Sequence, residues 1–590
     1  ATLSQARACL RLFPTSFSVS EHAALSMLTE AHVMCSTDYG SAAAVAWAQD
    51  FQFDPLLLTR DLTDFHAAGS SITALALQRQ QARAPDRISV QRIRDTFGPG
   101  GPESVGLSYQ DYNRLLHIAQ FGIRVFTPPG FTPCPTPAPL RIRYQEVHCA
   151  IHRLLHKQML DGSVVVLPLP EALTIPGIHL QNAQHWTTKK GKPQGRTIAD
   201  LSNTPDPLLH RPLNGHSSID KKTVTDACIA AYGPITHPTL TVLVLMVLAS
   251  ADTFGWDAIT LWKMDLQGAF NLLWFEPSSV PLLAFPLMFG LVVIHLVGLF
   301  GWAGMPYAFH VLTRALDRLI ATRISGSSAF YVDDLMACSA VHLVEADRTV
   351  ARSIITSLAG STALARDKDE LGRRLDFIGW QICLSTRTVS LSRRNLLKTC
   401  HAFFCFQLGD KLPLLLLQRM SSLAVRMSEL CPLMRPYTTS LSASTHGFVG
   451  SAPGIRHSLS ALALCDIAMW RAYLLLLHAE ILPAARPMES FRVTPPQYVI
   501  EYDASLTGLA AGVSSLSPDG TKTLLRFAAV PVPFPTLQDS SYQNTCEFLA
   551  VILGLLVASS LDLAHFRYRL LGDSKASLAW ALHGRSNSQR

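Results

Sequence analysis

The order of hydrophobic and polar positions predicts alternating helices and strands with two proline-rich breaks. Residues 1–128 carry helical patterns such as EHAALSMLTEAHVMC and no recognisable motif, which predicts a helical N-terminal extension of unknown role. Residues 129–144 lie in the proline-rich stretch FTPPGFTPCPTPAPL and its continuation, and they predict a stiff linker. The pattern EVHCAIHRLLHKQMLDGSVVVLP then predicts a helix that ends at Gly162 and leads into a strand.

The middle of the chain, residues 145–385, alternates strand and helix patterns. HWTTKKGKPQGRTIADLSN predicts a basic hairpin with glycine and proline at its tip. From Leu261 the pattern is a strand (LWKMD), two short apolar runs, a helix (PYAFHVLTRALDRLIATRI), a hairpin (SAFYVDDLMACS) and a further strand pair (LDFIGWQICL). Helical periodicity then dominates residues 386–490. After a second break, RVTPPQ, residues 495–590 open on the alternating strand QYVIEYDAS and continue as an α/β pattern.

Composition and charge narrow the class of protein. The 590 residues are 48% hydrophobic and 16% charged, so the chain can bury several cores. The net charge is +7, and most of the excess lies between Arg387 and Arg435, as expected for a polyanion partner. The twelve cysteines include no CxxC pair, and the first residues of the sequence do not have the pattern of a secretory signal. We therefore expect an intracellular protein of the cytoplasm or nucleus.

One apolar stretch imitates a membrane span. Residues 281–300 carry no Lys, Arg, Asp or Glu over roughly the length that a bilayer requires. Pro286, Gly290, His295 and Gly298 interrupt it, however, and no basic cluster flanks it. Two buried strands explain the stretch better than a membrane helix does.

Two adjacent carboxylates inside an apolar run carry the candidate chemistry. Burying Asp333 beside Asp334 is costly unless a cation neutralises them. Asp265 ends an earlier apolar strand, and the three acids converge if the two strands are neighbours in one sheet. Carboxylates of this kind select Mg²⁺ or Mn²⁺, and two such ions can hold both the attacking and the leaving oxygen of a phosphoryl transfer.

The run AFYVDDL resembles the catalytic hairpin of reverse transcriptases, and four further segments occur in that family's order. KMDLQGAF resembles the strand with the first catalytic Asp, FGWAGMPYAF the loop that contacts template and nucleotide, ARDKDE the lysine-bearing segment, and FIGW the primer-grip strand. The hairpin KKGKPQGRTIADLS is similar to the fingers segment that holds the incoming triphosphate. The resemblance covers roughly residues 145–385.

The resemblance implies a role for each matching residue. Asp265 and Asp333 are the expected principal metal ligands, with Asp334 as a third carboxylate. The expected substrate-binding residues are Lys189, Lys190, Arg196, Phe270, Gly301 and Lys368. Phe270 falls at the aromatic gate beneath the sugar, which implies dNTPs rather than rNTPs. Many retroviral enzymes have Gln where this chain has Phe300, so the polar contact of that Gln is not carried over.

Three acids in the last segment resemble a second catalytic set. Asp503 ends a strand, Glu547 lies on an apolar helix, and Asp573 follows another strand, which is the order of Asp, Glu and Asp in the ribonuclease H fold. In that fold the acids bind two metal ions and the enzyme hydrolyses the RNA strand of an RNA–DNA hybrid. A fourth acidic or His position is expected on a later helix and does not follow before Arg590, so we expect an incomplete domain.

The sequence therefore predicts an α+β right-hand polymerase with fingers, palm and thumb, followed by an α/β ribonuclease H-like domain that is truncated. Expected domains are the extension (1–128), the linker (129–144), fingers and palm (145–385), a basic helical thumb and connection (386–490) and the ribonuclease H-like domain (495–590). The resemblance implies a reverse transcriptase that uses two Mg²⁺ or Mn²⁺ ions per site, with an RNA template, a DNA primer or RNA–DNA hybrid, and dNTPs as partners.

KGKPQGRTIADLS, FGWAGMP and LLGDSKASLAW resemble DIRS-type retrotransposons, which include the VIPER group, more closely than they resemble retroviruses. Three alternatives stay open: an RNA-dependent RNA polymerase, an inactive or domesticated scaffold that binds nucleic acid, and a membrane protein built on residues 239–300. An assay with rNTPs against dNTPs separates the RNA polymerase from the reverse transcriptase. An inactive scaffold would be expected to have lost metal ligands, and a membrane protein would partition into detergent.

Overall fold

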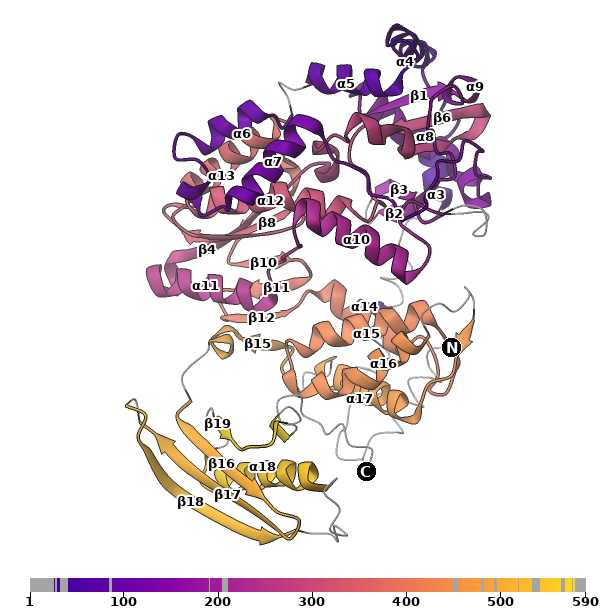
Figure 1. Cartoon of the computed structure of the whole chain (residues 1–590). Coiled ribbons are helices and arrows are strands. Elements are labelled where there is room, and N and C mark those ends of the chain that lie inside the picture. Colours follow the sequence, from indigo (N-terminus) through magenta and orange to yellow (C-terminus); the bar gives the residue numbers. More distant parts are fainter. Residues whose placement is uncertain are drawn as a thin grey trace. The chain divides into compact units, whose positions relative to one another are not determined.

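The computed structural model describes residues 26, 29–31, 41–83, 87–189, 192–203, 211–448, 455–478, 482–492, 496–517, 519–532, 542–563, 568–575 and 577–578. The chain divides into two compact units (Figure 1). One unit is Met34–Arg387, and the other combines Ala1–Val33 with Thr388–Arg590. Among the described helices, none is both long enough and apolar enough to cross a bilayer.

The first unit begins with helices that share one large hydrophobic core. They are α3 (Ser41–Trp47), α4 (Pro55–Ala67), α5 (Ile72–Arg83), α6 (Val90–Phe97), η2 (Pro102–Val105), α7 (Tyr109–Phe121) and α8 (Ile142–Leu160). This core contains buried residues drawn from segments between Ala44 and Leu364. Asp61, fully buried on α4, accepts from the backbone N–H of Val166 at 2.9 Å and pairs with Arg79 of α5 at 2.9 Å. These contacts fasten the helices to the strand that contains Val166.

The proline-rich segment is part of this unit, which corrects the prediction of a linker at residues 129–144. The backbone N–H of Ala138 donates to the carbonyl of Leu180, and that of Leu180 to the carbonyl of Cys134, both at 2.8 Å. Cys134 and Ala138 are buried, and α8 already begins at Ile142. The segment reads as a linker because proline is rigid, but here its carbonyls and small side chains pack against the rest of the unit.

The segment that imitated a membrane span forms two strands, as predicted. β6 (Leu291–His295) pairs on one side with β1 (Val164–Pro168) and on the other with β5 (Ala284–Pro286), both antiparallel. Every residue of β5 is buried, as are all but the first of β6. Burial on both faces explains the unbroken apolar run.

A four-stranded sheet with the order β7-β8-β4-β9 forms the centre of the unit. Its strands are β4 (Ile259–Asp265), β7 (Ser327–Tyr331), β8 (Asp334–Ala340) and β9 (Glu370–Gly372). Helices α11 (Leu240–Phe254) and α12 (Met305–Ala321) pack against it, and α13 (Val344–Ala359) lies between β8 and β9 along the chain. The other described elements of this unit are α9 (Leu169–Ala172), β2 (Ala183–Lys189), β3 (Lys192–Asp200), α10 (Ser218–Tyr232), η3 (Trp256–Ala258), η4 (Ala269–Leu272), η5 (Pro277–Leu283), η6 (Met288–Gly290), η7 (Arg366–Lys368), β10 (Arg374–Phe377) and β11 (Trp380–Cys383).

The second unit begins with a largely helical part, as the periodicity predicted. Its elements are β12 (Thr388–Leu391), α14 (Arg393–Phe404), β13 (Leu412–Pro413), α15 (Leu414–Ser428), η8 (Pro432–Thr438), α16 (Thr439–Gly447), β14 (Arg456–His457), α17 (Ala461–His478), β15 (Ala485–Pro487) and η9 (Met488–Phe491). The buried guanidinium of Arg471 on α17 donates to the carbonyls of Phe403 and Phe406, both at 2.7 Å. The N–H groups of Ser440 and Leu441 donate to Asp466. These buried polar contacts fix the packing of α17 against α14 and α16.

The C-terminal part is a four-stranded sheet with one described helix against it. The strand order is β18-β17-β16-β19, from β16 (Tyr498–Ala504), β17 (Gly508–Leu516), β18 (Lys522–Pro531) and β19 (Tyr568–Leu571). β16 runs antiparallel to β17 and parallel to β19. α18 (Gln543–Ser559) packs against β16 and β17, where a side chain at Gly554 would come within 2.3 Å of Ile500. The expected order of strand, helix and strand is confirmed.

Candidate functional site

The first three candidate acids meet at one end of the central sheet. Asp265, the last residue of β4, is the direct cross-strand partner of Asp334, the first residue of β8. Residues paired in this way on antiparallel strands project to the same face. Asp333 lies in the turn between β7 and β8, and its carbonyl accepts from the N–H of Leu266 at 2.9 Å. The structure therefore pairs Asp265 with Asp334 and places Asp333 in the adjoining turn, but the carboxylate oxygens of these three acids do not all lie within 4.8 Å of one another.

Burial, and after it mutual repulsion, shows in the pKa values of Asp333 and Asp334. Burial, Asp333 and Asp265 together raise the pKa of Asp334 to about 7, and its hydrogen bond to Asp265 favours the protonated form further. Burial also raises the pKa of Asp333, with a contribution from Asp265, while Lys368 and Arg196 oppose the rise. Like charges held this close favour either a shared proton or a bound cation.

The turn that carries Asp333 is strained. The register pairs Tyr331 with Asp334, so the hairpin loop is only Val332 and Asp333. Val332 has a φ of 53°, a left-handed conformation that is rare for a β-branched residue. A tight turn of this kind fixes where the carboxylate of Asp333 projects, at an expense of about 1–3 kcal/mol.

Three cationic side chains surround the acids. Nζ of Lys368, on η7, lies 2.5 Å from Oδ1 of Asp265. Arg196 comes from β3 of the basic hairpin and lies near enough to Asp333 to lower its pKa. Lys263 acts on Asp334 in the same direction and was not predicted as a site residue, although its position two residues before Asp265 puts it on the same face of β4. The predicted Lys189 is the last residue of β2, and Lys190 lies outside the described residues.

The loop at Gly301 approaches β3 too closely for a side chain. Gly301 has a φ of +126°, and a Cβ there would lie 1.8 Å from the carbonyl oxygen of Ala199. Nδ2 of Asn214 donates to the Gly301 carbonyl at 2.7 Å, and Oδ1 of Asn214 accepts from the N–H of Ala303 at 2.9 Å. Asn214 gives no signal in the sequence, because its partners are distant along the chain. The predicted Phe270 is buried on η4, five residues after Asp265.

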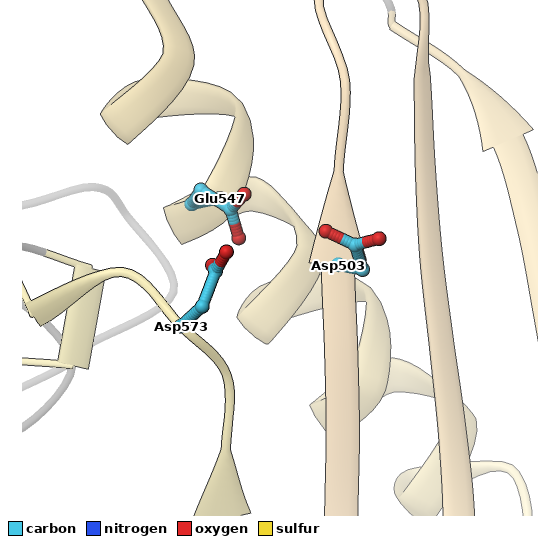
Figure 2. A group of neighbouring side chains, drawn as sticks. All are labelled: Asp503, Glu547 and Asp573. Atoms are coloured by element: carbon cyan, nitrogen blue, oxygen red, sulfur yellow. The ribbon is translucent and has the colours of Figure 1, made fainter.

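The acids of the C-terminal part form a second group, shown in Figure 2. The group consists of Asp503, Glu547 and Asp573. Each contributes one carboxylate oxygen, and these three oxygens lie within 4.8 Å of one another. Asp503 projects from β16, Glu547 from α18, and Asp573 from the segment after β19. A side chain at Gly572 would come within 2.3 Å of the ring of Tyr502, so the glycine lets that segment lie against the sheet. All three predicted acids therefore converge.

Glu547 is the buried member of this second group. Oε1 accepts from Nε2 of Gln543 at 3.0 Å, whereas Oε2 is buried without a hydrogen-bond partner. Burial raises the pKa of Glu547, and Asp573 and Asp503 add to the rise. An unpartnered buried oxygen that faces two further carboxylates fits a hard divalent cation. Gln543 was not predicted, although its place one helical turn before Glu547 could have revealed it.

Comparison with known proteins gives likeness of structure only. No protein-family model matches the chain, and no curated protein matches it. Solved structures of a foamy viral protease-reverse transcriptase are similar. The complex with dsDNA is 13% identical, with a TM-score of 0.39 over 84% of this chain and 91% of that one. The complex with RNA/DNA hybrid is 14% identical, with a TM-score of 0.36 over 82% of this chain and 59% of that one. At these values, the function must be inferred from the chain's own residues.

Proposed function

We propose that the chain is an RNA-directed DNA polymerase, a reverse transcriptase, of a retroelement, with an associated ribonuclease H-like domain. The observation that supports this most is the placement of Asp265 opposite Asp334, with Asp333 in the two-residue turn beside them. Three carboxylates at one sheet end, next to the cations Lys368 and Arg196, suit a reaction between negatively charged phosphates.

The residues present suit divalent cations, because burial and the neighbouring carboxylates Asp333 and Asp265 raise the pKa of Asp334 even though Lys368 pairs with Asp265. Asp265 and Asp333 would hold Mg²⁺ or Mn²⁺, with Asp334 as the third carboxylate. When bound, such ions stabilise the charge that develops on the attacking and leaving oxygens of an in-line phosphoryl transfer. In the proposed reaction the primer 3′-hydroxyl attacks the α-phosphate of a dNTP, and pyrophosphate leaves.

The surrounding residues position the substrates. Arg196 and Lys368 would neutralise phosphate charge, with Lys189 and Lys190 as further candidates on the hairpin. Phe270 would occupy the space that a 2′-hydroxyl needs, which favours dNTPs over rNTPs. The partners are an RNA template and a DNA primer. The motifs quoted above also support a DIRS-type element as the source.

The second group of acids would act on the product of the first. Asp503, Glu547 and Asp573 would hold two Mg²⁺ or Mn²⁺ ions for hydrolysis of the RNA strand of an RNA–DNA hybrid. The basic helices α14 and α15 would contact the sugar-phosphate backbone without reading sequence, so binding would weaken as salt rises.

Primer extension on poly(rA)/oligo(dT) with Mg²⁺ or Mn²⁺ tests the polymerase. We expect the chain to incorporate dTTP and the Asp333→Asn variant to lose at least about a hundredfold in rate, because a principal ligand is removed. Equal incorporation by both proteins would remove the assignment. Preferential use of UTP would instead favour an RNA-dependent RNA polymerase.

Degradation of a labelled RNA–DNA hybrid tests the second site. We expect weak cleavage that disappears in the Asp503→Asn variant, while primer extension by that variant stays at the wild-type rate. Cleavage that persists in Asp503→Asn would contradict the assignment of this group.

A further inference from the structure

Phe300 is an aromatic side chain beside the polymerase acids that is 45% exposed. Its backbone is fixed, because its carbonyl accepts from the N–H of Ala199 on β3 at 2.8 Å and the next residue is the tightly packed Gly301. An exposed ring on so constrained a backbone points to a role outside core packing.

The ring of Phe300 contacts the ring of Phe270, the sugar-gate candidate. The ring centroids of Phe300 and Phe270 are 4.6 Å apart, with planes tilted by 43°. Phe270 is buried and meets Phe309 of α12 edge-on at 5.3 Å. Phe270 therefore contacts both the ring of Phe309 and the ring of Phe300.

The ring of Phe300 also meets Arg196, the phosphate-binding candidate. The guanidinium carbon of Arg196 lies over the ring at 5.9 Å from its centroid, which is within the range of a cation–π contact. The same guanidinium acts electrostatically on Asp333. A glutamine at position 300 could make neither the ring–ring contact with Phe270 nor the cation–π contact with Arg196.

We propose that Phe300 is a positioning residue that couples Arg196, which would contact the triphosphate, to Phe270, which would contact the sugar. The proposal rests on the polymerase function proposed above. The ring holds the guanidinium in place and keeps Phe270 pressed under the sugar. Phe300 therefore sets both the affinity for the nucleotide and the preference for dNTP over rNTP.

Steady-state primer extension by the full chain tests this, with dTTP and UTP on poly(rA)/oligo(dT). In Phe300→Leu, which keeps an apolar side chain but loses the ring, we expect KM for dTTP to rise about three- to tenfold and kcat to change little. The dTTP to UTP ratio of kcat/KM falls as well. Phe300→Tyr keeps the ring, so its KM for dTTP and its dTTP to UTP ratio should stay close to those of the wild-type chain. Phe121→Leu, which removes an exposed ring from α7, serves as the control.

A double-mutant cycle tests the contact itself. Arg196→Lys raises KM in the wild-type background, and we expect a clearly smaller rise in the Phe300→Leu background, because the ring that positions Arg196 is already gone. Additive effects overturn the coupling, as does a Leu variant with unchanged KM and discrimination. A change in kcat or thermal midpoint alone indicates a purely structural role. An absence of extension by the wild-type chain contradicts the polymerase function rather than the role of Phe300.

Discussion

At the scale of single residues, Asp334 is held at an energetic expense. Its pKa is raised to about 7 by burial and by Asp333 and Asp265, whereas an aspartate in an unfolded chain titrates near pH 4. The folded protein therefore binds this proton more tightly than the unfolded chain does. Ionised Asp334 destabilises the fold fully above pH 7, and the penalty is lost as the pH falls toward 4.

Replacing Asp334 should therefore stabilise the protein when metal is removed. In EDTA at pH 8 we expect Asp334→Asn to gain about 2 kcal/mol, after allowance for screening by solvent. The gain should mostly vanish at pH 4.5. Thermal unfolding at both pH values measures it, with the exposed Asp367→Asn as control. A gain that is equal at the two pH values would contradict the electrostatic explanation.

Single residues also show what the sequence can and cannot predict. The acids Asp265, Asp333 and Asp334 could be predicted because unpaired carboxylates in apolar strands are rare and have few explanations. Asn214 could not, because its hydrogen bonds to the Gly301 loop depend on tertiary packing. The same holds for Phe300, whose neighbours Arg196 and Phe270 come from distant segments.

At the scale of elements, backbone contacts hold the loop before α12 against the hairpin strand β3. The contact depends on Gly301, because any Cβ would overlap the carbonyl of Ala199. The N–H of Ala199 also donates to Phe300. The relative position of Arg196 and the loop is therefore set by backbone contacts.

Gly301→Ala should separate the two elements. We expect primer extension to fall at least about tenfold, since small displacements of substrate-positioning groups are costly. The matched control is Gly177→Ala, which has a similarly left-handed backbone, with φ of +73°, but no atom within 4 Å of the added Cβ. The control should lose only about 1 kcal/mol of stability. Equal activity of the two variants would show that the close approach is unimportant.

At the scale of the whole molecule, the N-terminal helices belong to the same core as the central sheet. Helical periodicity predicted them correctly but could not show what their apolar faces cover. Phe65, Ile93 and Ile118 are buried in the core that also contains Trp262 and Met264 of β4. Asp61 gives no local signal either, because its partner Val166 lies on β1.

Truncation tests this shared core. We expect residues 34–387 alone to be soluble and to unfold cooperatively, because the core from Ala44 to Leu364 lies within them. Residues 129–387 should aggregate or lack a cooperative transition, because removing α4 to α7 exposes the apolar surface that these helices cover. Thermal unfolding of the two fragments gives the comparison. A cooperative transition at the same midpoint in both would restore the N-terminal helices to a separate domain.

The most direct test of the central claim is the binding of Mn²⁺ to the full chain, followed by electron paramagnetic resonance. The wild-type chain should bind Mn²⁺ at two independent groups of acids. The double variant Asp265→Asn, Asp333→Asn should lose Mn²⁺ binding at the first group and keep it at the second. The double variant Asp503→Asn, Glu547→Gln should lose Mn²⁺ binding at the second group and keep it at the first. Unchanged Mn²⁺ binding after the loss of Asp265 and Asp333 would contradict the proposal that these acids hold the catalytic cations.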